Sequence, residues 1–316
     1  MRRLVWSLAC LLALVGCTPK PVAPDEPQPL GTIRIATATK AGVYFPVGEA
    51  MARLWNERIP SAKAEVMLTA GSAENFDLLL GQEADVAFAQ SGVAYSAGEG
   101  GSQVRSTLRG LTHLYPNVMQ LAVRKDSGIK DIVDLVGKRL VPGIHGSATL
   151  INAQELLALY GMSLSDMTVE HMGYGEAAAA LIEGRADATL VAGGLPTEAV
   201  RTLLESGEAE LLPLDAAAIV KKYPWYYPYS IPAGSYPGQT EEVRTVAVAN
   251  ILIARADMPE EHAYELVRTL YEGQEQLRAS HPAADLKLEQ ALRGITGVLP
   301  LHPGAARYFR EVGVLR

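Results

Sequence analysis

The feature that most restricts how this 316-residue chain can fold is the alternation of strand and helix patterns after residue 31. Residues 32–37 alternate apolar and polar side chains, as a half-buried strand does. A helix is expected from near Pro46, because its apolar residues share one helical face. A strand over 64–69, a helix over 72–80 and a strand over 85–89 follow. This βαβαβ order predicts a parallel sheet of an α/β fold. The apolar helical positions are Val47, Ala50, Met51, Leu54 and Trp55.

The same alternation returns later in the chain. In both halves a helix runs into a glycine-containing turn, an Ala-Asp pair ending at Asp85 or Asp187, and then a strand. We therefore expect two lobes with similar strand ends, and the alternative is chance recurrence of a common turn. A further strand over 245–253 and a long helix from Pro259, capped by Asp257, are also expected. The second set comprises strands over 121–123, 138–141, 168–171 and 188–191 and helices over 129–135, 149–160 and 176–183.

The N-terminus has the pattern of a bacterial lipoprotein signal. Arg2 and Arg3 precede the apolar run 4–15, which is too short to span a bilayer, and Leu-Val-Gly leads to Cys17. This pattern predicts a signal peptide over 1–16, cleavage before Cys17, and lipidation of that cysteine. Residues 17–30 are proline-rich and predict an extended tether. The expected location is the periplasm or the cell surface, held to a bilayer by the acylated Cys17. The alternative is an ordinary signal peptide in which the cysteine is incidental.

Composition excludes several classes of function. The two cysteines, Cys10 and Cys17, both lie at the N-terminus, so the mature domain has none for a disulfide, a thiolate metal site or a nucleophile. Because Arg2 and Arg3 are the only charged residues in 1–16, cleavage changes the formal net charge from −7 to −9. An acidic chain without a basic stripe argues against nucleic acid as a partner.

Catalytic, metal and cofactor patterns are not met either. The six histidines are scattered without metal-ligand spacing, and no Gly-x-Ser-x-Gly elbow occurs. Residues 173–178 resemble a dinucleotide-binding Gly-x-Gly-x-x-Ala, but the acidic strand end of that unit is missing. We therefore expect no enzyme, no metal and no cofactor.

Five glycine- and hydroxyl-rich corners follow the predicted strands, at 37–44, 70–75, 90–92, 143–149 and 193–197. Open α/β sheets bind ligands at such strand ends, and the free amides of a helix N-terminus favour an anion. Together the corners predict a cleft for a small organic anion, although each alone can be an ordinary capped turn. Tyr44, Tyr115 and Tyr174 either wall the ligand or pack the hinge, and residues 223–229 are expected to pack as a loop. The candidate ligand contacts are Thr37, Thr39, Lys40, Gly42, Val43, Tyr44, Ser72, Asn75, Gln90, Ser91, Ser147, Thr149 and Gly194.

Several motifs together resemble the TAXI family of solute-binding proteins, which serve TRAP transporters. They include 42–46 (GVYFP), 71–75 (GSAEN), 83–91 (EADVAFAQS), 192–196 (AGGLP) and 231–238 (IPAGSYPG). The resemblance implies a two-lobed, type II-like periplasmic-binding fold, in which each lobe is a sheet flanked by helices around a ligand cleft. It also implies delivery of the ligand to an ion-gradient-driven TRAP permease. On this basis lobe I is expected to comprise 31–121 plus 212–316, and lobe II 122–211.

The chain departs from the family pattern at two places on the expected cleft. Residues 36–41 replace a glycine-rich run with side chains that include Lys40, and His145 stands where small residues are usual. Glutamate, 2-oxoglutarate and related dicarboxylates are the ligands that the resemblance implies, and Lys40 would suit a second carboxylate or else be a solvated loop residue. The alternatives are a binding lipoprotein of an ABC importer or sensor system, and a surface lipoprotein without a small-molecule ligand.

Overall fold

The computed structural model describes residues 29–99 and 102–316. The predicted signal peptide, the lipidation site Cys17 and tether residues 17–28 lie outside this part of the chain. Within it, none of the helices combines the length and apolar character that crossing a bilayer requires.

The first lobe is built on the predicted βαβαβ unit. Strands β1 (Gly31–Ala36), β2 (Ala62–Met67) and β3 (Val86–Gln90) are parallel in the order β2-β1-β3, and helices α1 (Tyr44–Arg58) and α2 (Ser72–Leu80) connect them. All five predicted core positions of α1 are buried. The helix begins at Tyr44 rather than near Pro46, because a proline is tolerated in the first helical turn.

The second lobe has the same topology. Its strands β5 (Arg139–Val141), β6 (Thr168–Val169) and β7 (Ala188–Gly193) are parallel in the order β6-β5-β7, joined by α5 (Ala148–Leu159) and α6 (Tyr174–Ile182). Strand for strand and helix for helix, this unit matches that of the first lobe.

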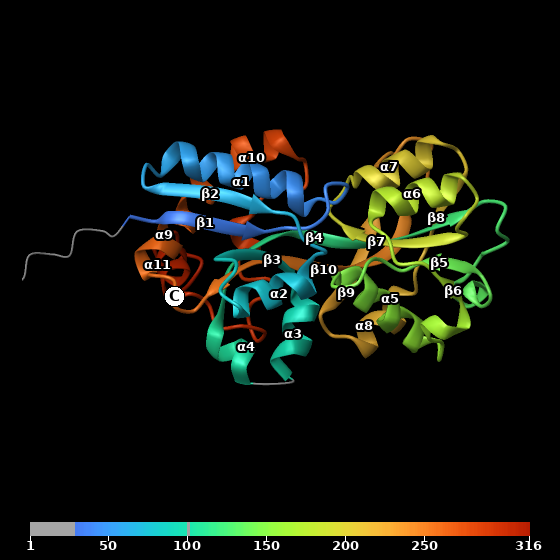
Figure 1. The fold of residues 1–316 in the computed structure, drawn as a ribbon, viewed down its shortest axis with the longest axis horizontal. Coiled ribbons are helices and arrows are strands. Elements are labelled where there is room, and N and C mark those ends of the chain that lie inside the picture. Colours follow the sequence, from blue (N-terminus) through green and yellow to red (C-terminus); the bar gives the residue numbers. More distant parts are fainter. Residues whose placement is uncertain (1–28, 100–101) are drawn as a thin grey trace, which may run out of the picture.

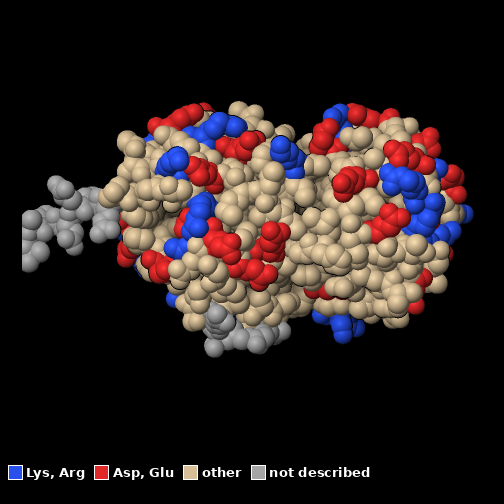
Figure 2. Space-filling model, viewed as in Figure 1, with Lys and Arg blue, Asp and Glu red and all other residues tan. Residues whose placement is uncertain are grey.

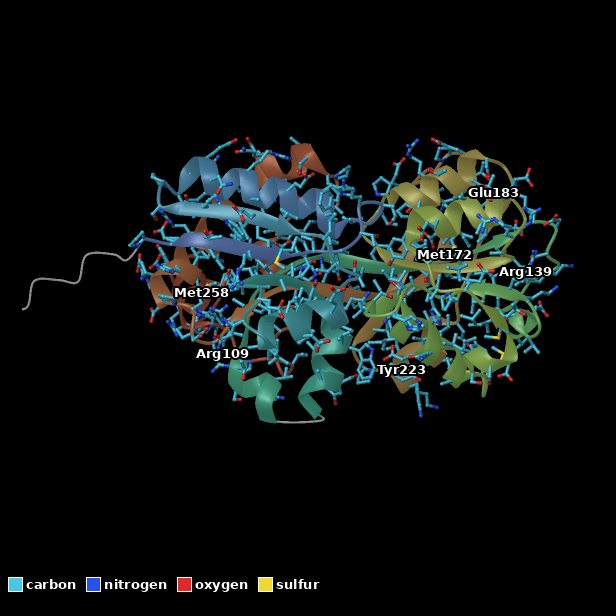
Figure 3. The ribbon with its side chains drawn as sticks, in the orientation of Figure 1. Arg109, Arg139, Met172, Glu183, Tyr223 and Met258 are labelled. Carbon is cyan, nitrogen blue, oxygen red and sulfur yellow. The ribbon has the colours of Figure 1, made fainter. Side chains whose placement is uncertain are left out.

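The recurrent Ala-Asp pair has the same structural role in both units. The carboxylate of Asp85 accepts hydrogen bonds from the backbone N–H and Nε of Arg34 at 2.9 Å each. The carboxylate of Asp187 accepts the equivalent pair from Arg139, at 2.8 and 3.0 Å. In each case the guanidinium also donates to a backbone carbonyl of the preceding turn, that of Gln82 or Gly184. Arg139 lies at the outer end of its lobe (Figure 3), so this duplicated motif secures the sheet far from the waist.

Two long strands connect the lobes. β4 (Leu108–Arg124) pairs with β10 (Val243–Arg255) in the first lobe and with β7 in the second. β10 in turn pairs with β3 through residues 250–254 and with β9 (Tyr226–Ile231) through residues 243–248. All these pairings are antiparallel, and they join the two parallel units into one continuous ten-stranded sheet (Figure 1). The register between β10 and β4 shifts at residues 250–253, where β10 also pairs with β3 of the first lobe.

Helices cover both faces of each half of the sheet. In the first lobe α1, α9 (Glu260–Glu272), α10 (Gln274–Ser280) and α11 (Pro303–Glu311) enclose one core. Helices α2, α3 (Ser91–Glu99) and α4 (Ser102–Thr107) enclose the other. In the second lobe α5 and α8 (Ala216–Lys222) lie on one side of the sheet, and α6 and α7 (Glu198–Glu205) lie on the other (Figure 1). The remaining elements are β8 (Ala209–Leu212), which pairs with β4, and 3-10 turns at Ile132–Leu135, Leu164–Asp166 and Leu288–Gln290.

The packing divides the lobes differently from the expectation. Residues 212–316 were assigned to lobe I, but Leu214, Ile219, Tyr226 and Val248 pack into the core of the second lobe. The reason is that the chain crosses back only near residue 249 of β10. Before that point, α8 packs on the core of the second lobe and β9 pairs with residues 243–248 of β10. The first crossing lies near residue 118 of β4, where its pairing passes to β7.

Three local expectations differ from the structure. Asp257 does not cap α9; its carboxylate accepts from Arg255 Nε at 2.9 Å, and Pro259 holds the cap position. The helix expected over 129–135 is only the 3-10 turn Ile132–Leu135. The aromatic run over 223–229 enters strand β9, where Pro228 pairs opposite Val246. A proline fits there because β9 pairs only with β10 among the described strands.

We expect Asp85→Asn to lower the free energy of unfolding at pH 7 by about 2 kcal/mol. Burial alone raises the pKa of this carboxyl, but the hydrogen bonds from Arg34 and Arg255 outweigh it and hold the pKa below its usual range. A depressed folded-state pKa stabilises the fold above the unfolded pKa of about 4, and the contribution disappears as pH falls through the folded value. Urea denaturation at pH 7 and pH 3 measures the difference.

The control for this prediction is Glu210→Gln, which changes an exposed carboxylate of β8. It should change stability by less than about 0.5 kcal/mol at either pH. An equal loss for Asp85→Asn at pH 7 and pH 3 would contradict the assigned role of the charged carboxylate.

Candidate functional site

A pocket lies between the two lobes, at the ends of the parallel strands. Its empty volume is about 500 Å³, including space open to solvent. Figure 2 shows the two rounded halves of the molecule meeting at a narrower waist. Lobe I supplies Ala38, Thr39, Gly42, Val43, Tyr44, Ala70, Gly71, Ser72 and Gln90, and lobe II supplies Ile144, Ser147, Ala148, Thr149, Met172, Gly173, Tyr174, Ala192 and Gly193. Met172 is labelled in Figure 3.

Four helices begin at residues that line this pocket. α1 and α2 begin at Tyr44 and Ser72, and their topological counterparts α5 and α6 begin at Ala148 and Tyr174. Ser147 caps α5 with its side chain, and Gly173, the cap residue of α6, donates its N–H to Glu176 Oε2 at 3.2 Å. No side chain caps α1, and in α2 the N–H groups of Ala73 and Glu74 donate to a backbone carbonyl of the second lobe. Unsatisfied first-turn N–H groups carry partial positive charge, so the convergence of four helix N-termini favours an anion. The duplicated unit thus places two such termini on each side.

Tyr44 and Ser72 form a hydroxyl pair on the lobe I side. Their oxygens lie 3.4 Å apart, Tyr44 Oη accepts from Asn117 Nδ2 at 2.7 Å, and Ser72 Oγ accepts from the backbone N–H of Gln90 at 3.1 Å. The pair has two hydroxyl protons and the bond between them uses one. The other proton is therefore available to a ligand acceptor.

Tyr174 and Thr149 form the corresponding pair on the lobe II side. Their hydroxyl oxygens lie 2.5 Å apart. The phenol of Tyr174 also donates to the carbonyl of Ala192 at 2.9 Å and accepts from its N–H at 3.1 Å, which fixes the ring against β7. Burial raises the pKa of both Tyr44 and Tyr174, so both phenols stay protonated and act as hydrogen-bond donors near neutral pH.

The two lobes are in contact across the pocket. The carbonyl of Gly146 in lobe II accepts hydrogen bonds from the N–H groups of Ala73 and Glu74 in α2, both at 3.1 Å. A Cβ atom at Gly42 would lie 3.6 Å from the ring of Tyr174, and one at Gly71 would lie 3.6 Å from Cα of Ser147. Gly71 has φ +125°, a conformation that L side chains rarely adopt. Loops of both lobes are therefore packed against each other at the edge of the pocket.

Eight of the predicted ligand contacts line the pocket: Thr39, Gly42, Val43, Tyr44, Ser72, Gln90, Ser147 and Thr149. Ser147 is also engaged in capping, because its Oγ donates to the carbonyl of Ile144 at 2.7 Å and accepts from the N–H of Leu150 at 3.2 Å.

Two predicted contacts lie beneath the pocket instead of lining it. Thr37 Oγ1 donates to the carbonyl of Met67 at 2.7 Å. Asn75 is fully buried; its Nδ2 donates to the carbonyls of Thr37 and Phe88 at 2.8 Å, and its Oδ1 accepts from Thr69 Oγ1 at 2.7 Å. Both side chains hold the strand ends and loops together.

The other three predicted contacts also lie outside the lining. Lys40 is exposed, with its Nζ 5.8 Å from the centre of the Phe45 ring. Ser91 lines a separate cavity beside Trp225. Gly194 faces Tyr115 and Ala283, and its neighbour Gly193 lines the pocket. These residues were predicted because they lie in glycine- and hydroxyl-rich corners after strands. Packing decides which side chains of each corner face the pocket.

Tyr174 is the lining residue that the list of ligand contacts most clearly missed. The sequence is compatible with Tyr174 either walling the ligand or packing the hinge, and the geometry places it on the pocket. The Gly-Tyr-Gly at the start of α6 is the signal that could have identified it, since the equivalent first turn of α1 carries Gly-Val-Tyr. Within residues 29–99 and 102–316, no group of three or more His, Cys, Asp or Glu is placed to hold a metal ion.

The fold and the pocket together define the chain as a protein of the type II periplasmic-binding-protein fold. Solved structures with this fold include the three that follow. They are the aliphatic sulphonate binding protein SsuA of Escherichia coli (15% identity, covering 89% of this chain and 83% of that one, TM-score 0.51), a putative L-cystine ABC transporter of Listeria monocytogenes (13%, 81% and 96%, 0.53) and the binding protein component of an ABC phosphonate transporter of Pseudomonas aeruginosa (11%, 80% and 80%, 0.54).

The chain belongs to the NMT1-like family, because a sequence model of that family matches residues 35–313. The match covers nearly all of the described chain, from β1 to the end of α11. The more specific assignment to the TAXI family stays a prediction.

Proposed function

We propose that this protein is the solute-binding receptor of an importer, and that it captures a small organic anion by closing its two lobes. The observation that carries this proposal is the convergence of four helix N-termini and two hydroxyl pairs on one pocket between the lobes. A ligand that contacts both sides favours the closed state, because only there can it bind all of these groups. The crossing strands β4 and β10 supply the hinge.

Residues outside the described part of the chain support an extracytoplasmic location. The predicted signal peptide and Cys17 would hold the domain on the outer side of a membrane, and the tether would keep it near its permease. Lipidation of Cys17 can be tested by mass spectrometry of the protein extracted from membranes.

The transporter is the part of this proposal with two candidates. The similar proteins of Listeria monocytogenes and Pseudomonas aeruginosa are described as parts of ABC transporters, which supports an ABC importer. The sequence motifs resembling the TAXI family support a TRAP permease instead. A neighbouring gene for an ATPase subunit would decide for the first, and one for a large multi-span permease would decide for the second.

The site supports binding rather than catalysis. No Asp, Glu, Lys, Arg or His lines the described pocket, so no side chain there combines a nucleophile with a general base. Recovery of an unaltered ligand after prolonged incubation with the protein is the expected result, and turnover would favour an enzyme.

A thermal-shift screen of the mature domain against carboxylates, 2-oxo acids and amino acids tests the proposed function. A ligand at about 100 times its dissociation constant should stabilise the fold by about 2.7 kcal/mol. For a chain of this length we expect the melting temperature to rise by several degrees. If no small anion changes it, the protein is better explained as a surface lipoprotein without a small-molecule ligand.

A further inference from the structure

We propose, on the basis of the binding function above, that the site selects a small acid with one carboxylate and one hydrogen-bond donor, a hydroxyl or an amino group. A dicarboxylate is then the wrong ligand, although the sequence resemblance implies one. Three features of the pocket lead to this proposal: its charge, a buried acceptor and its apolar walls.

The charge of the site suits a single oxyanion. The described residues that line the pocket include no cationic side chain, and Lys40, the residue linked to a second carboxylate, is exposed against Phe45. Positive potential therefore comes from the helix N-termini, each of which carries at most about half an elementary charge. One carboxylate can be held by these amides and by the available hydroxyl proton of the Tyr44–Ser72 pair. A second would lose its hydration without gaining a cation.

A buried acceptor provides the place for a donor on the ligand. Gln90 ends β3 and lines the pocket, and only 1% of its surface is exposed. Its backbone N–H is satisfied by Ser72 Oγ, but its Oε1 has no hydrogen-bond partner among the described residues. A buried carbonyl oxygen without a partner costs free energy, which an N–H or O–H of the ligand would recover.

The remaining walls suit an apolar ligand body. Val43 faces the pocket from lobe I, and Ile144, Ala148, Met172 and Ala192 face it from lobe II. None of them can pair with a polar substituent at the far end of a ligand. The combination of anion-binding helix termini, one buried acceptor and apolar walls distinguishes a short hydroxy or amino acid from a diacid.

A panel of acids on the unmodified mature protein tests this proposal by isothermal titration calorimetry. The four-carbon acids butyrate, 2-hydroxybutyrate, 2-aminobutyrate, succinate and malate vary the donor and the second carboxylate separately, and glutamate and 2-oxoglutarate add the implied ligands. We expect 2-hydroxybutyrate or 2-aminobutyrate to bind about 10-fold more tightly than butyrate. Both dicarboxylates of the same length should bind at least about 10-fold more weakly than the preferred acid.

Two variants connect the preference to its residues. Gln90→Met keeps the size of the side chain but removes the acceptor, so it should abolish the preference for the donor-bearing acid while leaving the affinity for butyrate within about 3-fold. Lys40→Ala should leave every affinity in the panel unchanged within the same range, since Lys40 lies outside the lining. Circular dichroism melting curves show whether each variant is folded before its affinities are compared.

The outcomes separate this inference from the proposed function. Tightest binding of succinate, malate, glutamate or 2-oxoglutarate overturns the inference but leaves an anion receptor. A donor preference that survives in Gln90→Met overturns the role of Gln90. Absence of binding by every acid in the panel overturns this inference, and the thermal-shift screen then decides whether the proposed anion receptor is also wrong.

Discussion

Replacing Gly42 with leucine is expected to reduce the affinity of the preferred acid by at least about 100-fold, or about 2.7 kcal/mol. A Cβ atom at residue 42 would lie 3.6 Å from the ring of Tyr174, so the longer side chain would occupy the space in which the lobes meet. The closed state then becomes a minor population, and the apparent dissociation constant rises in inverse proportion to it. Titration calorimetry measures the loss, and small-angle X-ray scattering should show a larger radius of gyration.

Gly42→Ala is the matched control, because its single methyl group makes only an ordinary van der Waals contact with Tyr174. We expect its affinity to stay within about 3-fold of the parent and its radius of gyration to be unchanged. Gly42 does not have a positive φ, so neither substitution strains the backbone. Parent-like affinity in Gly42→Leu would show that binding does not need this closed contact.

Replacing Asn75 with alanine is expected to lower the free energy of unfolding by about 3 kcal/mol or more. The substitution removes the hydrogen bonds that Asn75 makes with the carbonyls of Thr37 and Phe88 and with Thr69 Oγ1, while Thr69 Oγ1 keeps its bond to the Thr37 carbonyl at 2.9 Å. Each buried polar group that loses its hydrogen bond costs about 1–3 kcal/mol. Urea denaturation measures the change, and it should appear with or without ligand.

Asp77→Ala, in the same helix but exposed, serves as the control and should change stability by less than about 0.5 kcal/mol. The alternative outcome for Asn75→Ala is parent-like stability with loss of ligand binding. That result would return Asn75 to the ligand contacts that the sequence predicted and would contradict its role beneath the pocket.

Much of the fold was predictable because its parallel units have regular local patterns. The helical face of α1, the bounds of α2 and the duplicated turns at Asp85 and Asp187 all follow from spacing and turn residues. The long strand β4 was not predictable beyond residues 121–123. It contains Gly110, Pro116, Asn117 and Gln120, which are unfavourable in an isolated strand but lie here in a strand that pairs with β10 over 108–118 and with β7 over 118–123.

The candidate site was predicted in part for the same reason. Glycine- and hydroxyl-rich corners mark the ends of parallel strands, so Tyr44, Ser72 and Thr149 could be selected from sequence. Which side chain of a corner turns inward depends on neighbours from elsewhere in the chain. Asn75 turns under the sheet toward Phe88, Lys40 lies against Phe45, and Tyr174 is held on the pocket by Ala192 of β7.

Patterns along the chain were enough to show that two similar α/β units follow one another and that their strand ends carry groups suited to an anion. Local periodicity and turn chemistry act over a few residues, and therefore they can be recognised without the fold. Where the chain crosses between the lobes, and which hydroxyls pair at the pocket, became visible only in the folded structure. These features depend on contacts between residues far apart in the chain, such as Tyr44 with Asn117 and α2 with Gly146, which no local pattern encodes.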